Sequence, residues 1–133
     1  MTTFKSVLVS TLFVFSLFAA TATWASSLTE SQENAVRSAK HYLSLEGFSR
    51  RGLIQQLSSS LGSGYSVADA TVAVDSLHIN WDKEAVRSAK QYLIIEGFSC
   101  RGLVQQLSSS VGAGTGYTVS QATYGAQKAG ACQ

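Results

Sequence analysis

The chain has no proline, two cysteines and two histidines among its 133 residues. Because proline is absent and strand-like alternation of apolar and polar residues is hard to find, the sequence favours an all-α fold. His41 and His78 do not form a metal-ligand pattern such as a pair one helical turn apart. We therefore expect neither a metal nor a cofactor.

Residues 1–25 have the composition of a signal peptide. Lys5 precedes an apolar run over residues 7–20, and small residues end the segment, so we predict cleavage between Ala25 and Ser26. The alternative is an uncleaved anchor, because the 19 residues 7–25 could barely span a bilayer. Both interpretations predict an exported protein, periplasmic, secreted or at the cell surface, with membrane contact only through this segment if it is uncleaved.

Excess charge of either sign is also scarce. The chain carries ten Lys and Arg against eight Asp and Glu, and loss of Lys5 with the signal segment leaves nine against eight, a formal charge of +1. This balance predicts no polyanionic partner, nucleic acid included.

The main feature of the sequence is a stretch that occurs twice, at residues 35–62 and 85–112. Aligned without a gap, 22 of the 28 positions are identical. After a loop, residues 65–70 and 117–122 match at an offset of 52. Such repetition indicates a duplicated supersecondary unit. We predict two tandem modules, residues 26–82 and residues 83–133, and an interface between them because each is too small to bury much surface alone.

Each module reads as three short helices. The first has one apolar stripe and ends near Gly47, where we expect a left-handed cap, and Ser49 is placed to cap the second. The third follows Ser66 or Thr118, which have capping-box spacing. In the first module the second and third helices should bury one set of apolar residues: Leu53, Ile54, Leu57, Leu61, Val67, Ala70, Ala73, Val74 and Leu77. Asp82 is the expected N-cap of the second module.

Two functional patterns fail on inspection. The second and third helices have the lengths of a helix-turn-helix, but the helix that would enter a DNA groove, residues 67–77, carries Asp69 and Asp75 and no Lys or Arg. The serines 58–60 have no base tied to them by spacing, and Glu46 recurs only as one carboxylate per module. We therefore expect neither DNA binding nor enzymatic activity.

The repeated order of motifs resembles the Ltp-type repeat of host cell surface-exposed lipoproteins. The motifs are A-x-x-S/A-A-x-x-Y-L, FS-x-x-GL-x-x-QL and Gly-Tyr-Ser/Thr-x-x-x-A, with Asn80 and Trp81 after the first copy. The resemblance implies an exported trihelical-repeat protein, often prophage-encoded, that excludes superinfecting phages by blocking DNA injection through the tail tape-measure protein. The chain departs from the family in two ways: no lipid-anchoring Cys follows the signal segment, and the second copy lacks a counterpart of Trp81. A structural or adhesive envelope protein that binds another host component is the alternative.

Differences between the copies suggest where a partner binds. Ser44 and Leu45 become Ile94 and Ile95, and Val72, which points away from the apolar stripe of its helix, aligns with Tyr124. We expect Ile94, Ile95, Val72 and Tyr124 to form either the interface between the modules or a patch for a partner helix.

The two cysteines also distinguish the copies. Cys100 replaces Arg50 near the start of the second helix, and Cys132 replaces Asn80 just past the third. Since both changes occur in one copy of an exported chain, we predict a disulfide between Cys100 and Cys132. Intermolecular pairing or a free thiol on a frayed tail is the alternative.

Overall fold

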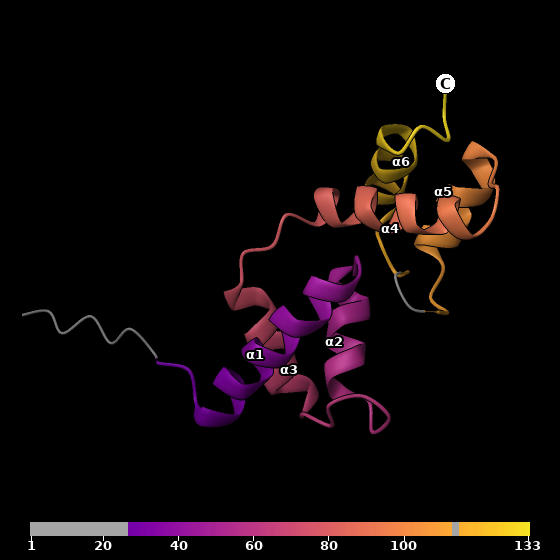
Figure 1. Cartoon of the computed structure of the whole chain (residues 1–133). Helices are drawn as coiled ribbons and strands as arrows, with labels where there is room; N and C mark the ends of the chain where they lie inside the picture. Colours follow the sequence, from indigo (N-terminus) through magenta and orange to yellow (C-terminus); the bar gives the residue numbers. More distant parts are fainter. Residues whose placement is uncertain (1–26, 113–114) are drawn as a thin grey trace, which may run out of the picture.

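The computed structural model describes residues 27–112 and 115–133, which form six α-helices and no strand (Figure 1). The helices are α1 (Glu30–Leu45), α2 (Arg50–Ser58), α3 (Val67–Ser76), α4 (Trp81–Ile95), α5 (Cys100–Ser108) and α6 (Val119–Lys128). They form two three-helix modules, α1–α3 and α4–α6, so the predicted all-α tandem fold is confirmed. The proposed signal segment with its cleavage site at Ala25 and Ser26 lies outside the described residues.

Each helix is preceded by a polar residue whose side chain accepts a hydrogen bond from a backbone N–H of the first turn. These N-caps are Thr29, Ser49, Ser66, Asn80, Ser99 and Thr118. Thr118 forms the predicted reciprocal capping box with Gln121. Ser66 accepts from the Asp69 N–H, but the Asp69 carboxylate instead accepts hydrogen bonds from the side chains of Ser31 and Gln32, which joins α3 to α1.

The prediction that Asp82 caps α4 is wrong. Asn80 is the cap, accepting from the Lys83 N–H, and Asp82 lies in the first turn. The modules are thus joined by fewer residues than expected, since α4 already begins at Trp81. The Trp81 side chain packs against the core of the first module, although its backbone starts the second.

Each module has its own apolar core. In the first the buried apolar side chains are Ala35, Ala39, Phe48, Leu53, Leu57, Ala70, Ala73 and Val74. In the second they are Ala85, Ala89, Leu103, Leu107, Tyr117, Ala122 and Ala126. Two residues expected in the first core are exposed, because α2 ends at Ser58, before Leu61, and Val67 is the first residue of α3.

The modules contact each other through the turn between α1 and α2, here called the docking turn (Glu46–Ser49). It rests on one side of α4, here called the docking face (Glu84, Arg87, Ser88 and Gln91). The Gly47 N–H donates to Gln91 Oε1 at 3.0 Å, and the Arg87 guanidinium donates to the Leu43 carbonyl. The predicted interface between the modules is therefore present.

Gly47 does not adopt the left-handed conformation expected of a helix cap. Positive φ angles occur among described glycines at positions 64, 112, 116 and 130, and not at 47. A Cβ atom on Gly47 would instead lie 2.5 Å from Ser88 Oγ and 2.9 Å from the Glu84 carbonyl oxygen, closer than real contacts allow. The glycine therefore serves the close approach of the modules.

Candidate functional site: exposed apolar side chains and a pocket on α1

Several large apolar side chains face solvent in the second module. Ile94 is 84 % exposed and Ile95 81 % exposed, both at the end of α4, and Tyr124 on α6 is 40 % exposed. Large apolar side chains exposed on a small domain are typical of a protein-binding surface.

The interpretation of these positions as the interface between the modules is wrong. That interface is formed by the docking turn and the docking face, and Ile94 and Ile95 remain almost fully exposed beside it. Val72 is also 40 % exposed, but it lies on α3 in the first module. Tyr124 occupies the equivalent place in the second module, where Lys128 Nζ lies 5.7 Å from the centre of its ring. At this distance the Lys128 ammonium is attracted to the ring, which stays partly exposed.

The first module has a pocket on α1. Its lining side chains are Arg37, Ser38, His41, Tyr42 and Ser63, and its volume is about 290 Å³. Ser38 Oγ and the Tyr65 hydroxyl share a hydrogen bond of 3.2 Å, and Tyr42 and Ser63 share another of the same length. The hydrogen bonds from Ser63 and Gln56 lower the pKa of the Tyr42 phenol. Hydrogen bonds from Tyr65 and Ser63 therefore hold the pocket side chains of Ser38 and Tyr42 in place.

Sequence reasoning missed a buried polar cluster at the docking face. Ser88 is 1 % exposed and hydrogen-bonds the Tyr117 hydroxyl at 2.8 Å. Burial raises the pKa of Tyr117, and burial also raises the pKa of Glu84, whose buried Oε2 atom lies 3.7 Å from Arg87 Nη1. The signal available in the sequence was the change of Asn34 to Glu84 and of His41 to Gln91 between copies.

The structure contains the predicted disulfide. Cys100, the first residue of α5, is bonded to Cys132, and their Cα atoms are 4.7 Å apart. The Cys132 side chain also packs against the core of the second module. The bond therefore holds the chain after α6 against the start of α5.

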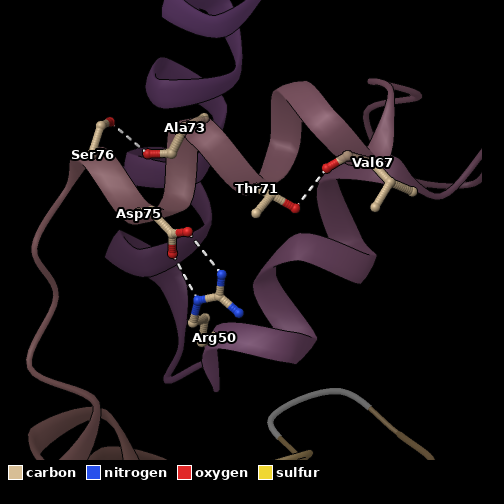
Figure 2. A network of polar contacts seen from close by, with 6 residues as sticks. All are labelled: Arg50, Val67, Thr71, Ala73, Asp75 and Ser76. Atoms are coloured by element: carbon tan, nitrogen blue, oxygen red, sulfur yellow. Dashed lines mark hydrogen bonds and ion pairs between the residues drawn. The ribbon is translucent and has the colours of Figure 1, made fainter.

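In the first module, a non-covalent link begins at the position that corresponds to Cys100. Arg50, the counterpart of Cys100, donates from Nε and Nη2 to the two oxygens of Asp75 on α3, at 2.7 and 2.8 Å (Figure 2). The guanidinium holds the pKa of the Asp75 carboxyl below its usual range. Both side chains are about half exposed, at 48 % and 50 %. From equivalent positions at the start of their second helices, Arg50 thus forms an ion pair with α3, whereas Cys100 forms a disulfide with the chain after α6.

Two other kinds of site are absent from residues 27–112 and 115–133. No three His, Cys, Asp or Glu side chains gather there in a way that could hold a metal ion. In the same ranges, no helix is both long and apolar enough to cross a membrane.

Two packed three-helix modules with exposed apolar side chains define a tandem helical-repeat protein. The family model for host cell surface-exposed lipoproteins matches residues 30–77 and again residues 80–128. The chain belongs to this family.

One solved structure has the same arrangement. It is Ltp, a superinfection exclusion protein from the Streptococcus thermophilus temperate phage TP-J34, which is 29 % identical to this chain. The match covers 76 % of this chain and 97 % of that one, with a TM-score of 0.67. A search of curated proteins gave no match.

Proposed function

We propose that the protein excludes superinfecting phages. The observation that carries the proposal is the match to Ltp over 97 % of its chain, which extends through both modules and therefore includes their mutual arrangement. In this proposal the protein is exported, as its apolar N-terminal segment and its disulfide support. It acts by binding a phage protein rather than by catalysis.

The finer proposal is that the partner is the tail tape-measure protein and that the bound state blocks DNA injection. The expected contact is a helical segment of that protein, because the exposed side chains Ile94, Ile95 and Tyr124 offer apolar contacts of the kind that an amphipathic helix makes. Val72 presents a smaller side chain at the position equivalent to Tyr124. We therefore expect a partner helix to bind the second module in preference to the first.

Expression of the protein in a phage-sensitive host tests the proposal. For at least one phage in a broad panel, plaque formation should fall while adsorption stays normal and entry of phage DNA is lost. Phage mutants that escape should carry changes in the tape-measure gene. If no phage in the panel is affected, exclusion is rejected and the adhesive or structural alternative stands; escape changes elsewhere reject only the tape-measure partner.

The repeat supplies matched variants for the binding surface. Ile94→Ser and Tyr124→Val give the second module the residues that the first module has at the same positions. Ile94 is 84 % exposed, so Ile94→Ser should change stability by no more than about 0.5 kcal/mol; Tyr124 is 40 % exposed and contacts Lys128, so Tyr124→Val should cost about 1 kcal/mol. We expect protection to be lost, whereas Leu45→Ile, which makes the reverse kind of exchange in the first module, should leave it intact. Full protection by both variants would rule out this surface.

A further inference from the structure

Each module carries both halves of the contact that joins the two modules, yet the chain uses only one copy of each half. The docking turn (Glu46–Ser49) recurs without change as Glu96–Ser99. The docking face on α4 recurs on α1, with Arg37 and Ser38 aligned to Arg87 and Ser88. One turn and one face are therefore left over in every chain.

The second turn is exposed where the first is buried. Gly47 and Ser49 are buried against the second module, whereas Gly97 and Ser99 are exposed. A Cβ on Gly97 would meet no atom of the described chain within 4 Å, and its φ angle is not positive. Neither the backbone conformation nor packing within the chain therefore requires glycine at position 97, although docking requires it at position 47.

The unused face is the pocket on α1. Arg37, Ser38 and His41 line it at the positions equivalent to Arg87, Ser88 and Gln91. The supporting hydrogen bond is repeated too, because Ser38 with Tyr65 matches Ser88 with Tyr117. Ser88 is 1 % exposed beneath the docked turn, while Ser38 is only half-buried, so the pocket occupies the space that the turn fills in the other module.

The polar groups of the α1 pocket can form the hydrogen bonds that join the docking turn to the second module. In the occupied contact Gln91 accepts the Gly47 N–H, Arg87 donates to the Leu43 carbonyl, and the Ser49 hydroxyl donates to the Thr115 carbonyl. On α1 a ring nitrogen of His41 can accept and Arg37 can donate. Ser63, two residues before Tyr65 as Thr115 is before Tyr117, offers the carbonyl. Arg37 donates to Asn34 in the single chain and would exchange this exposed bond for the new one.

We propose that the turn Glu96–Ser99 of one copy docks into the α1 pocket of a second copy, in the geometry that the two modules of one chain already display. The contact is heterologous, because different surfaces of the two copies meet. Each added copy keeps one free turn and one free pocket, so association continues head to tail.

Sedimentation equilibrium of the purified chain tests the proposal. The range should run from about 10 µM to 1 mM, since contacts below the standard interface size bind weakly. The average mass of the wild type should rise steadily past that of a dimer. Gly97→Ala, which removes the room needed at the turn, and Arg37→Glu, which places a carboxylate against the incoming carbonyl, should each weaken association more than tenfold. Both positions are exposed or open in the single chain, so both variants should keep the wild-type circular dichroism and melting temperature.

Mixing the two variants distinguishes this contact from a symmetric one. Gly97→Ala retains an intact pocket and Arg37→Glu retains an intact turn, so an equimolar mixture should form dimers and nothing larger. Ile94→Ser is the control, because Ser44 at the equivalent position stays exposed in the occupied contact, and this variant should associate as the wild type does. A wild type that stays monomeric at 1 mM, variants that associate like the wild type, a mixture that stays monomeric, or loss of association in Ile94→Ser alone would each overturn the proposal.

Discussion

Replacement of both cysteines by serine should lower the stability of the second module far more than any exchange at the equivalent site of the first. The disulfide joins residues 32 positions apart in the sequence. The chain-entropy model gives about 3.7 kcal/mol at 25 °C for a loop of this length. For a small domain, each kcal/mol shifts the melting temperature by about 4–8 °C, so Cys100→Ser/Cys132→Ser should melt roughly 15–30 °C lower than the oxidised wild type.

The ion pair in the first module provides the comparison. Arg50 and Asp75 make two hydrogen bonds between α2 and α3, but both side chains are about half exposed, so water screens their attraction. Exposed pairs of this kind contribute about 1 kcal/mol or less. Asp75→Ala should therefore lower the melting temperature by only a few degrees, although it removes the partner of Arg50 on α3.

Differential scanning calorimetry with and without reductant measures both effects. The reduced wild type should melt close to the double serine variant, and the double serine variant should not respond to reductant. If the double variant melts within about 4 °C of the oxidised wild type, the loop-closure reasoning is refuted, because that shift corresponds to less than about 1 kcal/mol. If Asp75→Ala is as damaging as the double variant, the argument that exposure weakens the ion pair fails.

Two further predictions concern the contact between the modules. Gly47→Ala should destabilise the protein by about 1–3 kcal/mol in urea titration, because its Cβ would lie 2.5 Å from Ser88 Oγ, whereas Gly97→Ala should stay within about 0.5 kcal/mol; equal effects would contradict this account. Glu84 has a folded-state pKa raised by burial, so its contribution to stability is present below its ordinary pKa of 4.5 and is lost as pH rises through the folded value. Urea titrations over pH should therefore show that acidification into this range stabilises the wild type relative to Glu84→Gln, and a difference curve of opposite slope would contradict the burial of Glu84. Asp75 and Asp69, whose pKa values are lowered, act in the opposite direction but do so equally in both proteins.

The helices and the disulfide could be predicted because the two copies check each other. One apolar stripe is weak evidence for a helix. The same stripe 50 residues later, with the same serine cap, indicates that both copies fold into the same three-helix module. The cysteine pairing followed from two coordinated changes in one copy, and it is confirmed by the structure. Local patterns predict element ends less well. The spacing favours Asp82 as the cap that Asn80 provides, and the apolar stripe includes Leu61, which lies beyond the end of α2 and is exposed.

The contact between the modules could not be predicted in this way, because identical residues in the two copies have different surroundings. Gly47 and Gly97 stand in the same four-residue turn, and only the tertiary arrangement buries one and exposes the other. No local pattern distinguishes Gly47 from Gly97. The sequence therefore predicts a helix cap at Gly47, which the structure does not contain.

The positions at which the two copies differ indicate which docking face is occupied within the chain. At the docking face, Asn34 becomes Glu84 and His41 becomes Gln91; the Gln91 side chain accepts the Gly47 N–H, and the backbone of Glu84 lies against Gly47 of the docking turn. The face of the second module is therefore the one altered to hold a neighbour permanently, while the face of the first module keeps polar groups of the same kind around an open pocket. Exchange of these residues, Asn34→Glu with His41→Gln, should strengthen head-to-tail association in sedimentation equilibrium without changing the fold. Unchanged or weaker association would contradict this reasoning. It would mean that the short connection between the modules, and not Glu84 and Gln91, keeps the docking turn on the docking face.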